Sequence, residues 1–128
     1  MKYLAAGFHV FVLHYSLVPD VFPRALMELA LSMKLIREHG NEWNVDVKRI
    51  AVSGFSAGGH LACCLGTFWN KEWLYKALEV KPEMIQPNGM ILCYPVITSE
   101  EYVIKGHLNV LWELRLLRRM KNFAGFCP

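Results

Sequence analysis

Apolar positions recur along the chain with two different periods, and the change of period predicts alternating strands and helices. Phe8–Tyr15 alternates between apolar and polar residues and then runs apolar, which predicts a strand. Phe22–His39 instead repeats apolar residues at helical spacing, which predicts a helix with one face packed against a sheet. The residues of that face are Leu26, Leu29, Ala30, Met33 and Ile36.

Residues that typically begin or end helices occur at the boundaries of the apolar pattern. Asp20 is placed to cap the long helix, Pro23 falls in its first turn, and Gly40 is expected to end it. Gly7 is expected to end a short helix over residues 1–6 in the same way.

The rest of the chain continues the alternation. Ile50–Ser53 is a short apolar run that predicts a buried strand, and Met90–Ile97 predicts another. Between them, a helix that is apolar on nearly all sides is predicted from Ala57 to about Trp69, and a small helix over Glu72–Glu79. This order favours the α/β class, with a mostly parallel sheet flanked by helices.

Composition bounds the domain count and excludes several function classes. The chain has 128 residues, of which 54% are hydrophobic, so it supports at most one globular domain. The formal net charge of +3 is too small for the dense basic face of a nucleic-acid-binding protein. No run reaches the roughly 18 apolar residues of a membrane span, so membrane insertion is not expected.

The four cysteines carry no metal or redox motif. Cys63, Cys64, Cys93 and Cys127 form no Cys-x-x-Cys pair, which argues against zinc and thioredoxin-type chemistry. They are expected to be buried thiols of a reducing compartment, so the predicted location is cytoplasmic. Neither a metal ion nor an organic cofactor is expected.

The stretch Gly54-Phe55-Ser56-Ala57-Gly58 carries the candidate chemistry, because it fits the Gly-x-Ser-x-Gly nucleophile elbow between a predicted strand and a predicted helix. A serine at the tip of such a turn is exposed and attacks a carbonyl carbon once a base takes its proton. Gly54, Gly58 and Gly59 are expected to let strand and helix pass closely. The N–H of Ala57 is the expected oxyanion donor.

Competing interpretations of this region are structural. The Gly-rich stretch also suits a turn in some other α/β protein, whereas a phosphate-binding loop would need a Gly-x-x-x-x-Gly-Lys-Ser/Thr pattern that is absent. His60 lies one helical turn beyond Ser56 and is expected to be a core or supporting histidine instead of the base. Asp46 precedes the elbow strand, at the end of the sheet away from active groups, and is expected to hold a turn.

Residues 54–62 resemble the elbow of the acetyl-xylan-esterase-like branch of the α/β-hydrolases, which is related to the hormone-sensitive-lipase-like carboxylesterases. Three other stretches are similar to that family: Tyr15-Ser16-Leu17-Val18-Pro19, Trp43-Asn44-Val45-Asp46 with Arg49-Ile50, and Tyr94-Pro95-Val96-Ile97. The resemblance spans about Gly7 to Thr98. It implies a serine carboxylesterase that forms an acyl-enzyme on Ser56, with small acyl esters such as acetylated carbohydrate as substrates.

The resemblance also implies that parts of the fold are missing. The family places a His-Gly-Gly loop and a third strand before the matched region, and the triad acid and base after its sixth strand. Ser99–Pro128 offers no match for that pair, and His107 and Glu113 stand in the reverse order. We therefore expect an incomplete α/β-hydrolase fold, lacking the N-terminal strands and the C-terminal part, and a chain that by itself is unstable and hydrolytically inactive.

The missing third strand should change how the strands pair in the sheet, because the family places it between the strands matched by Phe8–Tyr15 and Ile50–Ser53. Without it, the two edges would stand about 9–10 Å apart, which is two strand spacings. We expect either a gap with unpaired backbone groups or a new pairing in an order that the family does not use.

The chain is expected to consist of two parts. Residues 1–98 form the central part of an α/β-hydrolase domain, and residues 99–128 form a divergent tail in which Leu108–Met120 predicts a basic amphipathic helix. Such a helix can bind a membrane or a partner, but a tail without an evolved role is preferred. A non-catalytic binding module and a fragment of a serine peptidase stay open as alternative functions, and the oligomeric state is left open.

Overall fold

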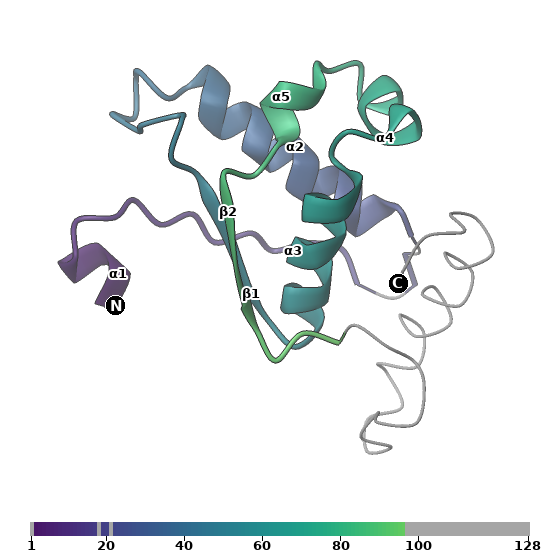
Figure 1. The fold of residues 1–128 in the computed structure, drawn as a ribbon, viewed down its shortest axis with the longest axis horizontal. Coiled ribbons are helices and arrows are strands. Elements are labelled where there is room, and N and C mark those ends of the chain that lie inside the picture. The colour runs from purple at the N-terminus through teal and green to yellow at the C-terminus, as the bar shows by residue number, and fades with distance from the viewer. Residues whose placement is uncertain (1, 18, 21, 97–128) are drawn as a thin grey trace.

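The computed structural model describes residues 2–17, 19–20 and 22–96. Within them, strands β1 (Ala51–Phe55) and β2 (Gly89–Cys93) pair in parallel, in a register that runs from Ala51 opposite Gly89 to Phe55 opposite Cys93. The helices are α1 (Lys2–Ala5), α2 (Arg24–Glu38), α3 (Ala57–Phe68), α4 (Glu72–Ala77) and α5 (Pro82–Ile85), as Figure 1 shows.

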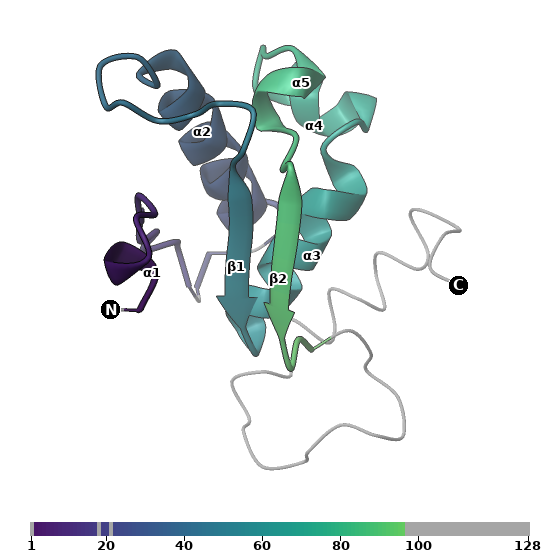
Figure 2. The ribbon, with the colours of Figure 1, turned by 60° about the vertical axis from the view of Figure 1, so that its left-hand side comes forward.

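Helices α2 and α3 lie on one side of the sheet, behind the strands in Figure 2. Helix α3 packs on both strands, and α2 packs against α3 and α5. Exposure along β1 alternates accordingly: Val52 and Gly54 are buried, whereas Ser53 and Phe55 are exposed. Since side chains alternate between the two faces of a strand, the described part of the sheet has one covered face and one open face.

The core lies between the sheet and these helices. All five apolar positions predicted for the face of α2 are buried, so the period of the sequence identified that face correctly. The buried apolar residues are Leu26, Leu29, Ala30, Met33, Ile36, Ile50, Val52, Ala62, Cys64, Leu65, Phe68, Leu74 and Ile85.

Some of the helix ends follow the predictions and others do not. Gly7, at a φ of 83°, follows α1 as expected. Asp20, however, does not cap α2, and its carboxylate instead accepts a hydrogen bond from Arg24 at 2.9 Å. Pro23 occupies the N-cap position, so it precedes the helix and does not lie in its first turn as predicted. The short helix α5, which begins at Pro82, was not predicted.

The strand predicted over Phe8–Tyr15 is wrong. A strand forms only where the backbone hydrogen-bonds to the edge of a neighbouring strand, and in the described structure this segment pairs with neither β1 nor β2. Side chains hold the segment instead: the ring of Phe11 lies 5.6 Å from that of Trp43, and Leu13 packs against the core. The segment therefore does not re-pair with β1 or β2 in the new order that was the second expected outcome.

Several predictions concern residues outside the described ones. Residues 97–128 include the predicted Leu108–Met120 helix, His107 with Glu113, and Cys127. Strand β2 ends at Cys93, so the strand expected to reach Ile97 is shorter than predicted. Among the described residues, no helix is both long and apolar enough to span a bilayer.

Candidate active site

Ser56 lies at the turn that joins β1 to α3. Its backbone adopts φ 51° and ψ −115°, a conformation that residues other than glycine rarely adopt, and it occupies the N-cap position of α3. Ser56 is exposed. The predicted order of strand, tight turn and helix is therefore present, with the serine at its tip.

Backbone hydrogen bonds fasten this turn to the end of β2. The N–H of Ser56 donates to the carbonyl of Cys93 at 3.1 Å. The Ser56 carbonyl accepts from the N–H of His60 at 3.0 Å and from that of Val96 at 3.4 Å. Because both backbone groups of Ser56 are used, the strained conformation is held by structure on two sides of the turn.

The glycines of the motif differ in how much space a side chain would have at each position. A Cβ at Gly54 would collide with the carbonyl of Gly58 and lie 2.6 Å from the nitrogen of Gly59. A Cβ at Gly59 would lie 3.0 Å from the Gly54 carbonyl oxygen and 3.1 Å from Cβ of Pro95. Gly54 needs glycine because backbone passes backbone there, whereas a Cβ at Gly59 would require its neighbours to shift by a few tenths of an ångström.

The expected clearance role of Gly58 is wrong. A Cβ at that position would meet the hydroxyl of Tyr15 at 3.9 Å, which is an ordinary contact distance. Gly58 matters through its backbone carbonyl, which lies where a Cβ on residue 54 would be and so requires glycine at that position.

Ala57 is the first residue of α3 and is half-buried. The N–H groups in the first turn of a helix have no acceptor within that helix, and the helix dipole places partial positive charge there. The Ala57 N–H therefore stands beside the serine with the polarity that an oxyanion requires, and its role as a donor stays a prediction.

His60 and Asp46 have the structural roles expected of them. His60 is buried, with Nε2 3.4 Å from Sγ of Cys64. Burial lowers the pKa of His60, and a hydrogen bond to the backbone of Val96 opposes this effect. The Asp46 carboxylate accepts from the N–H of Lys48 at 3.0 Å, which forms a turn before β1.

The base and acid of a triad are not assigned within the described residues. There, the side-chain oxygen of Ser56 makes no hydrogen bond to a histidine or a carboxylate. No group of three or more His, Cys, Asp or Glu in the same part of the chain is placed to hold a metal ion.

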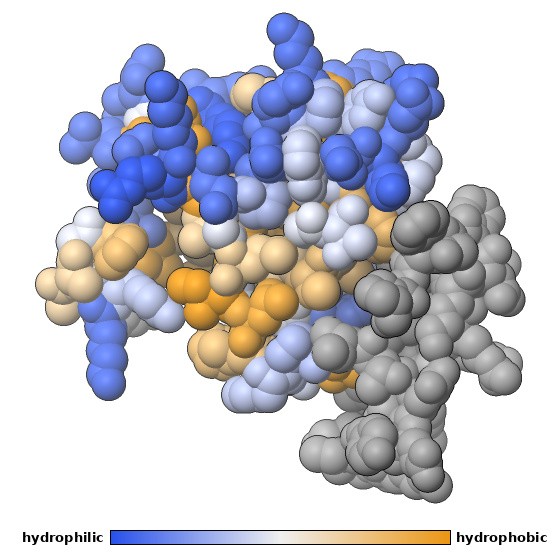
Figure 3. All heavy atoms as spheres, in the orientation of Figure 1, coloured by the Kyte–Doolittle hydropathy of each residue, from blue (hydrophilic) through white to orange (hydrophobic). Residues whose placement is uncertain are grey.

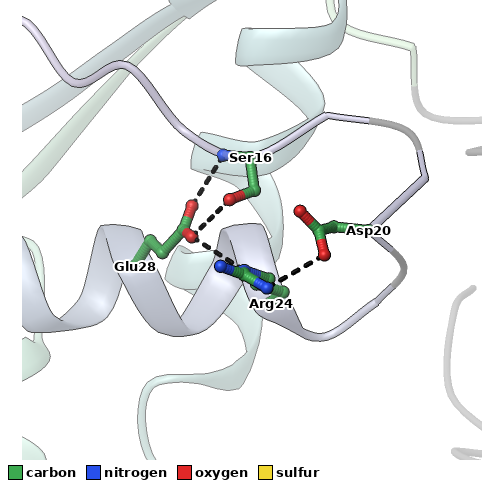
Figure 4. Close-up of polar contacts among 4 residues, drawn as sticks. All are labelled: Ser16, Asp20, Arg24 and Glu28. Atoms are coloured by element: carbon green, nitrogen blue, oxygen red, sulfur yellow. Dashed lines mark hydrogen bonds and ion pairs between the residues drawn. The ribbon is translucent and has the colours of Figure 1, made fainter.

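Sequence reasoning missed a polar network between α2 and the segment that precedes it, drawn in Figure 4. Glu28 of α2 accepts hydrogen bonds from both the N–H and the hydroxyl of Ser16, while Arg24 joins Glu28 to Asp20. The stretch that contains Ser16 resembles the family, but nothing in the local pattern indicates its partner twelve residues later.

Comparison with known proteins gives a consistent picture. The BD-FAE family model matches residues 1–92. Endo-1,4-beta-xylanase B of Butyrivibrio fibrisolvens is 30% identical over 119 residues, and an acetylxylan esterase of Xylanibacter ruminicola is 29% identical over 97 residues. These alignments cover 87% and 76% of this chain. The chain spans 18% of the length of either relative.

Solved structures show the same relationship. A candidate carboxylesterase from Lactobacillus plantarum is 34% identical with a TM-score of 0.61, covering 67% of this chain and 36% of that one. An acetyl ester-xyloside bifunctional hydrolase from Caldicellulosiruptor lactoaceticus is 30% identical with a TM-score of 0.57, covering 80% and 42%. The chain therefore belongs to the BD-FAE family and holds part of the α/β-hydrolase fold of esterases.

Proposed function

We propose that Ser56 is the nucleophile of an acyl-ester hydrolase. The observation that carries the proposal is the exposed position of Ser56 at the strained turn between β1 and the N-terminus of α3. Oγ attacks the ester carbonyl, the bond to the alcohol breaks, and the proton from Oγ passes through a base to the departing alcohol. Water then attacks the acyl-serine, which releases the acid and restores the hydroxyl.

Negative charge that develops on the carbonyl oxygen is stabilised by the N–H of Ala57. This donor is fixed by the helix before substrate arrives, so it needs no reorganisation during the reaction. The proposed reaction uses no metal ion and no organic cofactor.

Small acyl esters are the proposed substrates. The names of two relatives support this class, since one is an acetylxylan esterase and another an acetyl ester-xyloside hydrolase. Acetyl groups on carbohydrate are accordingly the first substrates to test.

We expect very low turnover from the 128-residue chain by itself. In a serine hydrolase, loss of the catalytic base costs up to about 10⁶-fold in kcat. The described residues place no base on the hydroxyl of Ser56, so hydrolysis of p-nitrophenyl acetate should equal that of Ser56→Ala. A Ser56-dependent rate well above that of the variant would contradict this expectation.

A chimera tests the nucleophile where a base is supplied. Residues 8–96 of this chain would replace the matching segment of the Caldicellulosiruptor hydrolase, which is 30% identical to this chain. The folded chimera should hydrolyse p-nitrophenyl acetate, and Ser56→Ala in it should lower kcat by roughly 10⁴-fold or more. Ser53→Ala, which removes an exposed serine hydroxyl from β1, is the matched control and should keep the activity.

The same chimera separates the competing functions. A folded chimera without Ser56-dependent turnover would overturn the proposal and favour a non-catalytic binding module. Cleavage of peptide p-nitroanilides in preference to esters would favour a peptidase.

A further inference from the structure

Within the described residues, the segment of residues 8–17 joins no sheet, yet its end is held at a defined point on α2. The N–H of Ser16 donates to Oε2 of Glu28 at 2.7 Å, and the Ser16 hydroxyl donates to Oε1 at 2.6 Å (Figure 4). Both distances are short, as is usual for hydrogen bonds to an ionised carboxylate. One side chain of α2 thus holds both the backbone and the side chain of Ser16.

The charges around Glu28 favour its ionised form. Nε of Arg24 donates to Oε1 of Glu28 at 3.2 Å, and the other end of that guanidinium is held by Asp20 at 2.9 Å. The hydrogen bonds from Ser16 lower the pKa of Glu28 most, and Arg24 adds to the effect. The groups facing the carboxylate are thus Ser16 from the extended segment and Arg24 from α2.

The residue before Ser16 extends toward the elbow. Tyr15 is half-buried, and its hydroxyl lies 3.9 Å from the position that a Cβ on Gly58 would occupy. Gly58 is the second residue of α3, two positions after Ser56. Because Tyr15 precedes Ser16, the hydrogen bond that fixes the Ser16 backbone also restricts the position of the Tyr15 Cα atom.

We propose that Glu28 is a positioning residue, which through Ser16 holds the hydroxyl of Tyr15 against the nucleophile elbow at Gly58. The placement puts a phenol near the first turn of α3. The relevance of this placement to catalysis rests on the proposed function, but the placement itself does not.

A pH titration followed by amide NMR tests the proposal on the full chain. The folded-state pKa of Glu28 is below its ordinary 4.5, so the contact is complete above pH 4.5 and is lost as the pH falls through the lower value. The amide resonances of Ser16 and Gly58 should move with one common midpoint. In Glu28→Gln, that titration should vanish and exchange of the Ser16 amide hydrogen should accelerate by about tenfold or more.

Two variants separate positioning from general stabilisation. Tyr15→Phe keeps the ring and removes the hydroxyl, so Ser16 should still titrate while the response of Gly58 disappears. Glu38→Gln, on the same helix, removes an exposed ion pair with Lys34 and should leave both resonances unchanged.

The proposal is overturned if Gly58 does not follow Ser16, or if it follows equally in Tyr15→Phe. Circular dichroism over the same pH range verifies that the chain stays folded. If Glu28→Gln does not fold, the wild-type titration and Tyr15→Phe still decide the question. No ester turnover is measured, so the proposed function can fail while this placement stands.

Discussion

At the scale of single residues, the elbow combines a strained backbone at Ser56 with a glycine at position 54 that has no Cβ. The conformation of Ser56 costs on the order of 1–3 kcal/mol for a residue other than glycine, and the bonds to Cys93, His60 and Val96 hold it in place. Gly54 makes the close approach of strand and helix possible because its absent Cβ leaves room for the Gly58 carbonyl. The unusual geometry at one residue thus depends on the identity of another.

Gly54→Ala should destabilise the chain by about 3 kcal/mol, because the new methyl group collides with backbone that cannot move aside easily. Urea unfolding followed by circular dichroism measures the change. Gly89→Ala is the matched control, since a Cβ at this strand position meets Cβ of Ala51 at a relaxed 3.8 Å. Equal effects of the two substitutions would contradict the clearance argument.

His60 should make stability depend on pH below about 6.5, the ordinary pKa of a histidine. Burial lowers its folded-state pKa below 6.5, so the unfolded chain takes up a proton first as the pH falls. The stabilisation is present above pH 6.5 and is lost progressively as the pH falls below it. Thermal melts should show this decline in the wild type and in His39→Gln, and a smaller one in His60→Asn.

At the scale of elements, α2 organises what surrounds the sheet. The guanidinium group of Arg37 donates to the carbonyls of Met84 at 3.0 Å and Gln86 at 2.6 Å, and to Oδ1 of Asn88 at 3.1 Å. The same Asn88 oxygen accepts from the N–H of Ile50 at 3.1 Å. One planar fork therefore joins α2, the end of α5 and the starts of both strands.

The buried face of α2 should dominate its contribution to stability. Leu26→Ala should cost about 2–5 kcal/mol, because Leu26 is 1% exposed and its removal leaves a cavity in the core. Leu31→Ala, at a position 43% exposed on the same helix, should change stability by less than about 0.5 kcal/mol. Chemical unfolding of the two variants gives the comparison, and similar costs would show that the face was assigned incorrectly.

At the scale of the whole molecule, the described sheet is covered on one side. Parallel sheets are normally buried on both faces, and two strands give little stability without further packing. Figure 3 shows apolar residues gathered over the strands, and Phe55 and Ile91 on the open face are 56% and 43% exposed. An apolar surface of this kind favours association.

The chain should self-associate as its concentration rises, and Ile91→Thr should increase the monomer fraction. Threonine keeps the β-branched shape that suits a strand but is more polar. Light scattering coupled to size-exclusion chromatography measures the effect. Leu35→Gln removes an apolar side chain that is 48% exposed on α2 and should leave the association unchanged.

The sequence by itself determined the local features. The spacing of Leu26, Leu29 and Met33 identified the buried face of α2, because helical period depends on near neighbours. The order of strand, Ser56 and helix was equally predictable, since the close approach of strand and helix requires a glycine at position 54, which the sequence shows.

Tertiary structure decided everything that needs a distant partner. Phe8–Tyr15 has the pattern of a strand but forms none, because a strand requires an edge that the pattern cannot supply. The hydrogen bonds of Ser16 to Glu28 and the approach of Tyr15 to Gly58 depend on how segments fold back on one another. Local periods carry no information about such contacts, so only the folded chain brings these groups together.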